Sequence, residues 1–216
     1  MTPGGRRRAV ESNRPWKGDI VPCVAPSESF ARFVSLACHD LRTPLATVAG
    51  FAHTLERSDD LGDPAARYVS MMRTASEQMG ELLDALGIVT RIEAGRYTPA
   101  LIEADTLELA RAAAERLGEK AGAGGTGATV HVDRDPVEVG LAGLALCAVR
   151  HGVLERVELT AAGETVEIAP IPEAAAPIVL AEDLRDLGAA TARSVIEAIG
   201  GSLTLEGKRL LVRLPA

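Results

Sequence analysis

Hydrophobic residues recur at steps of mostly four and three residues from about position 28 onward. The positions in this first run are Phe30, Val34, Ala37, Leu41, Leu45, Val48, Phe51 or Ala52, and Leu55. This spacing gathers them on one side of an α-helix as a heptad-like seam. A serine at 27 or 29 is a typical N-cap, and the sequence SDDLGDP at 58–64 is typical of a turn. The pattern therefore predicts a long helix between these two signals.

A second hydrophobic run follows the turn and has a more regular heptad period. Its positions are Tyr68, Met72, Ala75, Met79, Leu82, Leu86 and Val89. They predict a helix from about Pro64 to Glu93, antiparallel to the first because the turn is short. One hairpin leaves a wide apolar stripe uncovered, whereas two hairpins related by a two-fold axis bury both stripes in a four-helix bundle. The pattern therefore predicts a homodimer.

Helical and alternating patterns are mixed in the rest of the chain. The predicted elements are a helix 105–118 capped by Asp105, a glycine-rich connector 122–127, a strand 129–132, a helix 137–151 capped by Asp135, a hairpin of strands 157–160 and 165–168, a helix 182–199, and strands 202–205 and 209–214. Helices that cover one face of a mostly antiparallel sheet form an α/β sandwich. The fold class predicted for the whole chain is therefore α+β.

Composition and charge exclude several kinds of binding partner and site. The chain has 216 residues and a formal net charge of -7, and all its aromatic residues precede position 98. Both features argue against nucleic-acid binding. No run approaches the apolar length of a membrane span and the start lacks a secretory signal, so we expect a cytoplasmic protein with no membrane contact. The three cysteines form no CxxC pair, which argues against disulfides or a cysteine-based zinc site.

These signals divide the chain into three parts. Residues 1–27 contain scattered prolines and an Arg-Arg-Arg run, and they are predicted to be a disordered basic tail. Residues 28–97 contain the helical hairpin, and residues 98–216 contain the α/β domain.

His39 lies on the first helix at the heptad position farthest from the hydrophobic seam. Asp40 adjoins it, and Arg42 and Thr43 follow three and four residues later on the same face. A carboxylate can accept one N–H of an exposed imidazole and leave the other nitrogen's lone pair free for nucleophilic attack. Pro44 removes the helical hydrogen bond to the carbonyl of Asp40 and should bend the helix there. The alternative interpretation is an ordinary surface histidine.

The run HDLRTPL that begins at His39 resembles the phospho-acceptor box of the dimerisation and histidine-phosphotransfer domain of two-component histidine kinases. The sequence RIEAG at 91–95 also resembles the sequence at which the second helix ends in that family. The resemblance implies that His39 is phosphorylated and that Asp40 acts as acid or base in the transfer. It implies that Thr43 orients the water that removes phosphate from a partner's aspartate, and that the helices dock a response-regulator receiver domain.

Residues 98–216 resemble, in the order and spacing of their elements, the GHKL-type ATP-binding domain that follows this bundle in histidine kinases. The positions that handle nucleotide in that family differ here. Cys147 stands where the family has a magnesium-binding asparagine, and Asp186 replaces a glycine in a segment where Gly188 remains. The strand at 165–168 is not followed by an Asp-x-Gly-x-Gly motif. Because cysteine is a poor ligand for Mg²⁺, the domain is predicted to be degenerate and ATP binding is not expected.

These observations favour a homodimeric histidine phosphotransfer protein of a two-component phosphorelay. His39 would exchange a phosphoryl group with a receiver aspartate, with Mg²⁺ on the receiver, and the protein would hold no tightly bound cofactor or metal of its own. An upstream histidine kinase is a further expected kind of partner. Two alternatives stay open: a divergent ATP-dependent sensor histidine kinase, and a non-catalytic partner that binds a regulator or forms a heterodimer with a full kinase.

Overall fold

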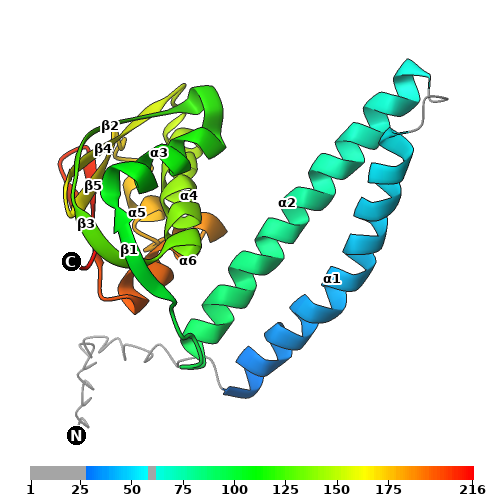
Figure 1. Ribbon diagram of the computed structural model, residues 1–216, viewed down its shortest axis with the longest axis horizontal. Coiled ribbons are helices and arrows are strands. Elements are labelled where there is room, and N and C mark those ends of the chain that lie inside the picture. Colours follow the sequence, from blue (N-terminus) through cyan, green and yellow to red (C-terminus); the bar gives the residue numbers. More distant parts are fainter. Residues whose placement is uncertain (1–27, 58–61) are drawn as a thin grey trace, which may run out of the picture.

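The computed structural model describes residues 28–57 and 62–216 (Figure 1). The predicted basic tail, residues 1–27, and positions 58–61 of the predicted turn lie outside the described residues.

Two long helices form an antiparallel hairpin (Figure 1). Helix α1 spans Glu28–Glu56 and helix α2 spans Asp63–Glu93. Pro64 lies in the first turn of α2, where the missing N–H of proline has no helical partner to lose and the fixed φ favours the helix. The predicted helical hairpin is confirmed.

The side chains that are buried along the hairpin are small or β-branched. Cys38 and Ala52 of α1 and Val69 of α2 are buried. Large side chains of the predicted seam are exposed instead, namely Leu41, Val48, Leu55, Tyr68, Met72, Met79 and Leu82. The stripe therefore lies on the surface of the hairpin and is not covered by the described part of the same chain.

The rest of the chain forms the α/β domain. Its helices are α3 (Thr106–Leu117), α4 (Arg134–Gly152), α5 (Ala176–Val179) and α6 (Leu187–Ala198), with a short 3₁₀ turn at Gly118–Lys120. Its strands are β1 (Leu101–Asp105), β2 (Ala121–Gly127), β3 (Thr129–Asp133), β4 (Val157–Gly163), β5 (Thr165–Ala169), β6 (Ser202–Glu206) and β7 (Arg209–Arg213).

Five strands form one sheet in the order β2-β4-β5-β7-β6, and β1 pairs with β3 in a separate two-stranded sheet. Only the β2–β4 pair of the large sheet is parallel. Alternate residues of β4 and β5 are buried, so one face of the sheet packs on the helices α3, α4 and α6. The largest buried side chains of this core include Leu109, Leu141, Leu144, Leu159, Ile168, Ile196 and Leu210. The predicted α+β fold with an α/β sandwich is confirmed.

The glycine-rich segment predicted as a connector is instead the edge strand β2. It pairs in parallel with β4, with Ala121 opposite Val157. A Cβ added at Gly125 would overlap the backbone carbonyl oxygen of Ala161, and one added at Gly122 would meet the movable end of the Glu158 side chain. Neighbouring groups thus occupy the space that side chains would take, and close packing of the backbone overrides the low strand propensity of glycine.

Two predicted helix starts are also wrong. Helix α4 begins at Arg134 instead of 137, so Asp135 lies inside the first turn and does not cap it. Glu138, on the next turn of α4, accepts a hydrogen bond from Arg134 Nε at 2.8 Å. Helix α6 begins at Leu187 instead of 182, because the side chain of Asp186 accepts a hydrogen bond from the Ala189 amide at 3.0 Å and ends the preceding loop.

Two elements were missed altogether, the strand β1 and the single-turn helix α5. Strand β1 has no alternating pattern because its first three residues are exposed, and its register is set by pairing with the distant β3. Asp105 at its end accepts hydrogen bonds from the amides of Leu107 and Glu108, which confirms the predicted cap of α3.

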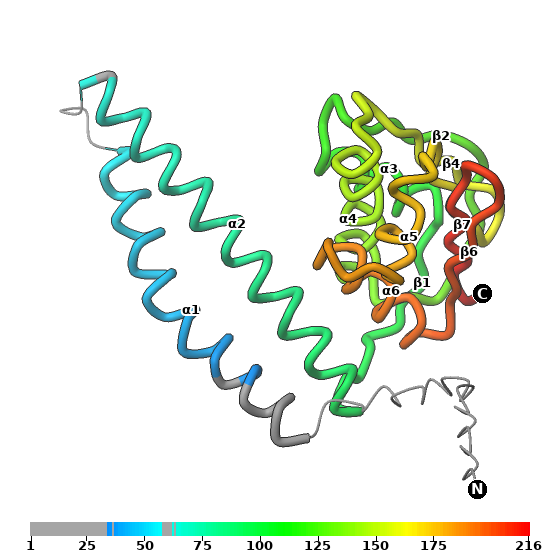
Figure 2. Tube along the Cα trace, turned by 180° about the vertical axis from the view of Figure 1, so that it is seen from behind, coloured from blue at the N-terminus to red at the C-terminus, as the bar shows by residue number. Residues whose placement is uncertain are grey.

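The hairpin and the α/β domain meet along the C-terminal half of α2. Helix α2 packs against α6, and Ile88, Ile92 and the Tyr97 ring rest on the buried core. The Tyr97 hydroxyl donates a hydrogen bond of 2.7 Å to Asp133 Oδ2, which ties the linker to the start of α4. The rest of the hairpin extends away from the domain, as the reverse view shows (Figure 2).

Candidate functional site

His39 lies in the N-terminal half of α1 with its side chain open to solvent. Its imidazole is 79% exposed, and the neighbouring Asp40 side chain is 68% exposed. The Nδ1 atom of His39 lies 3.2 Å from Asp40 Oδ1. With Nδ1 as the donor, this contact selects the tautomer whose Nε2 carries the lone pair and points to solvent. The structure thus brings the first two predicted site residues together as the sequence pattern anticipates.

The polar residues that follow His39 border the same surface. A shallow depression is lined by His39, Arg42, Thr43, Ala46 and Thr47. The Thr47 hydroxyl donates a hydrogen bond of 3.1 Å to the carbonyl of Thr43. Thr43 is exposed, so its hydroxyl can reach a phosphate or water placed in the depression.

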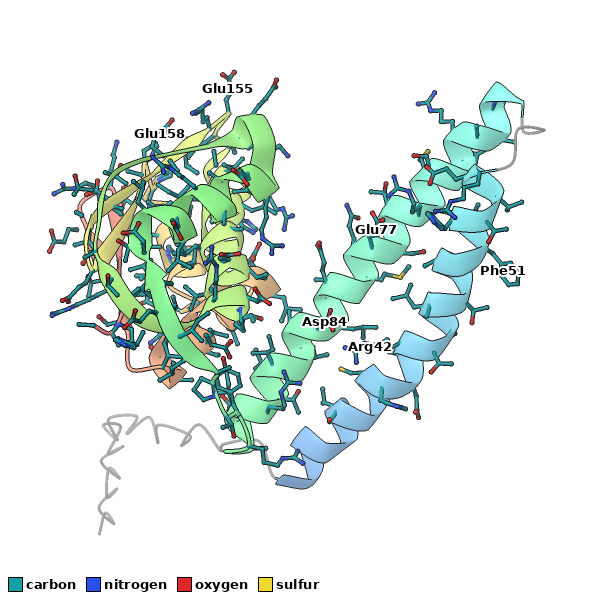
Figure 3. The ribbon with its side chains drawn as sticks, in the orientation of Figure 1. Arg42, Phe51, Glu77, Asp84, Glu155 and Glu158 are labelled. Carbon is teal, nitrogen blue, oxygen red and sulfur yellow. The ribbon has the colours of Figure 1, made fainter. Side chains whose placement is uncertain are left out.

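Arg42 links this surface to the second helix. Its Nη2 donates a hydrogen bond to Asp84 Oδ1 of α2, and the two side chains point toward each other across the hairpin (Figure 3). Pro44 follows within α1, and the helix continues through it without a break. Asp84 lies 42 positions from Arg42 and has no sequence signal that relates it to the site.

The three residues at the predicted nucleotide positions lie together between α4 and α6. Cys147 is buried on α4, and Asp186 is buried at the N-cap of α6. Gly188 packs on Gly143 of α4, because a Cβ at Gly143 would lie 3.2 Å from the Gly188 carbonyl oxygen. Gly188 therefore allows helices α4 and α6 to pack closely.

The Cys147 thiol lies close to the side chains of His151 and Asp186. Burial and the nearby Asp186 carboxylate raise the pKa of the Cys147 thiol to about 12. His151, one turn further along α4, places Nε2 3.4 Å from Asp186 Oδ2. Mg²⁺ is bound by oxygen ligands at octahedral positions, so a neutral thiol beside an imidazole does not match its preference. Sequence reasoning missed His151, although its spacing of four residues from Cys147 places both on one face of a helix.

Residues 170–181 lie between strand β5 and helix α6. This segment contains the short α5, and Ile171, Ala175, Ile178 and Val179 are buried in the core. The segment is thus packed against the domain by its apolar side chains.

The exposed His39–Asp40 pair lies on an antiparallel helical hairpin, and an α/β sandwich follows the hairpin. Residues 31–95 match the family model of the His Kinase A (phospho-acceptor) domain. The helical hairpin is therefore similar to the phospho-acceptor domain of histidine kinases.

Two curated relatives share parts of the sequence. The sensor protein DivL of Caulobacter vibrioides is 29% identical over 118 residues, which is 54% of this chain. The probable sensor histidine kinase TcrY of Mycobacterium tuberculosis is 34% identical over 71 residues, which is 32% of this chain. Each match spans 15% of the relative's own length.

Two solved structures share the fold. Full-length ShkA in complex with AMPPNP aligns with a TM-score of 0.61 and 22% identity, over 86% of this chain and 46% of ShkA. The histidine kinase AdeS of Acinetobacter baumannii aligns with a TM-score of 0.52 and 16% identity, over 82% of this chain and 97% of AdeS. Among the described residues, no helix is both long and apolar enough to cross a membrane.

Proposed function

We propose that this protein is a histidine phosphotransfer protein that exchanges a phosphoryl group between His39 and the aspartate of a response-regulator receiver domain, without using ATP itself. The observation that carries the proposal is the His39–Asp40 pair. Its imidazole is open to a partner, and its Nδ1 lies against a carboxylate that can hold the proton on that nitrogen.

The transfer follows from this geometry. The Nε2 lone pair of His39 attacks the phosphorus of the receiver's aspartyl phosphate in line, the new N–P bond forms, and the P–O bond to the aspartate breaks. The receiver's aspartate leaves as a carboxylate, and Mg²⁺ bound by the receiver neutralises charge on the phosphoryl oxygens. Positive charge develops on the ring, and Asp40 stabilises it by accepting the Nδ1–H hydrogen bond. The reverse reaction returns the group to a receiver.

The surface around His39 supports docking of such a partner. Arg42 and Thr43 border the depression beside the imidazole, where a guanidinium and a hydroxyl can contact phosphoryl oxygens. The exposed heptad stripe supports a second part of the proposal, that two hairpins pair as a homodimeric four-helix bundle.

The chemistry between α4 and α6 supports a phosphotransfer role independent of ATP. Cys147 has a thiol where Mg²⁺ would need oxygen, and Asp186 places a carboxylate at the helix N-terminus that a triphosphate would approach. An ATP-dependent kinase is the second candidate, because 71 residues of the chain are 34% identical to a protein named as a probable sensor histidine kinase.

One experiment with two labelled donors tests the proposal. The full chain is incubated with γ-labelled ATP and Mg²⁺, and separately with a receiver domain carrying labelled aspartyl phosphate. His39→Gln is the control in both arms. We expect label to reach the protein from the receiver only, and to be lost in His39→Gln. Label from ATP alone would establish the kinase instead, and no label in either arm would leave a non-catalytic partner.

A further inference from the structure

Three metal-ligating side chains from two helices meet in the α/β domain. Cys147 and His151 are four residues apart on α4, and Asp186 precedes α6. One ligand atom from each lies within 4.8 Å of the other two. Close packing of α4 on α6 at Gly143 and Gly188 brings them together. These two helices lie side by side between the sheet and α2 (Figure 1).

The donor atoms are shielded from water. Cys147 is fully buried, and the side chains of Asp186 and His151 are 6% and 24% exposed. The His151 Nε2 atom is buried and has no hydrogen-bond partner within the part of the chain that the structure describes. An unpaired buried nitrogen costs free energy unless a hydrogen-bond partner or a metal ion satisfies it.

Both carboxylate oxygens of Asp186 accept hydrogen bonds. Its Oδ1 accepts a hydrogen bond from the Ala189 amide at 3.0 Å, which fixes the orientation of the carboxylate. Its Oδ2 accepts a hydrogen bond of 3.2 Å from Arg150 Nη1 and lies 3.4 Å from His151 Nε2. The Arg150 side chain is 60% exposed, so it can move into solvent when a cation takes its place.

We propose that Cys147, His151 and Asp186 bind one Zn²⁺ ion, with a water molecule as the fourth ligand. A thiolate, an imidazole and a carboxylate suit this borderline-soft ion, which prefers tetrahedral sites, and they do not suit Mg²⁺. On binding, a Zn–S bond replaces the S–H bond of Cys147 and the proton passes to solvent. Because burial raises the pKa of the thiol, the bound ion must displace that proton, and binding strengthens as the pH rises.

The consequence for the domain is a metal link between α4 and the start of α6. Two of the ion's ligands, Cys147 and Asp186, stand at positions that the resemblance to GHKL-type domains relates to nucleotide binding. The link between two helices would stabilise the domain, because the ion binds the folded state. The inference goes beyond the phosphotransfer function and does not depend on it.

Zn²⁺ titration and cobalt spectroscopy test the site. The full chain is freed of metal with a chelator, titrated with Zn²⁺ alone, and separately loaded with Co²⁺. We expect one Zn²⁺ per chain and a thiolate-to-cobalt charge-transfer band in the near ultraviolet. The band should be absent in Cys147→Ser and present in the control Cys38→Ser, which changes a buried cysteine of the hairpin.

Two conservative variants extend the test. His151→Gln and Asp186→Asn should each weaken Zn²⁺ binding by about 100-fold or more. Asp186→Asn keeps an oxygen for the Ala189 amide, so the helix cap remains, and circular dichroism checks that each variant folds. Zn²⁺ should raise the Tm of the wild type and leave that of folded Cys147→Ser unchanged. A folded wild type without the cobalt band, or a band that survives Cys147→Ser, overturns the proposal.

Discussion

His39 and Asp40 could be predicted as a pair from sequence because their relation is local. Adjacent residues on a helix stay within reach of each other, and the heptad count already placed His39 away from the seam. The spacing of four residues between Cys147 and His151 could likewise have identified the two as neighbours on one face of a helix. No such signal exists for Asp84, which meets Arg42 only because the hairpin folds back on itself. Contacts between neighbouring residues of one helix can therefore be predicted from the sequence, whereas contacts between two helices cannot.

Replacing Asp40 should slow phosphoryl transfer without removing the acceptor. In Asp40→Asn the amide cannot stabilise positive charge on the ring, so the rate from a phosphorylated receiver to His39 should fall by about 100-fold or more, as for the loss of a general base. Quench-flow with labelled receiver measures the rate. Asp84→Asn is the matched control, because it removes a carboxylate that contacts Arg42 and not the ring, and the rate should change by less than about fivefold. Equal losses in both variants would contradict the role of Asp40.

At the scale of elements, the periodic segments were predictable and the glycine-rich one was not. The hairpin 157–168 and the last two strands alternate in burial as their sequences do. The glycine-rich sequence of β2 has no alternation of hydrophobic and polar side chains from which a strand could be predicted. Its pairing with β4 depends on a close approach of the two backbones that only glycine permits. Helix α6 begins where Asp186 caps it, five residues later than the acidic run at 182 suggested.

The adjacent glycines of β2 give a matched test of this packing. Gly125 has a φ of 103°, and a Cβ there would meet the Ala161 carbonyl, so Gly125→Ala should lower the free energy of unfolding by about 2–4 kcal/mol. A Cβ at Gly124 meets nothing within 4 Å. Gly124→Ala should therefore leave the stability unchanged or raise it by up to about 1 kcal/mol. Urea unfolding followed by circular dichroism compares the two, and equal effects would show that β2 does not approach β4 this closely.

The whole molecule combines a hairpin with an uncovered apolar stripe and a compact domain with a continuous core. The heptad steps predicted the apolar stripe. Its side chains are exposed, so within the described chain neither the other helix of the hairpin nor the α/β domain covers it. The way α2 packs on α6 could not be predicted, because it depends on the tertiary positions of two elements about a hundred residues apart. The stripe is therefore the surface on which assembly is expected.

A charge on the stripe should dissociate the expected dimer. Met79→Glu places a carboxylate at an exposed heptad position, where burial in a bundle core without a partner is costly. Gln78→Glu introduces the same carboxylate one residue away, off the heptad, and is the control. Light scattering coupled to size exclusion should find the wild type and Gln78→Glu as dimers and Met79→Glu as a monomer. A monomeric wild type would be evidence against the four-helix bundle.

The most direct test of the central claim is to identify the phosphorylated atom. Phosphorus NMR of the full chain, after incubation with a phosphorylated receiver domain, distinguishes phosphate on Nε2 from phosphate on Nδ1. The His39–Asp40 geometry predicts a single phosphohistidine at Nε2 of His39, absent from His39→Gln and absent when Mg²⁺ and ATP replace the receiver. Phosphate on Nδ1, on another residue, or on His39 from ATP alone would contradict this account.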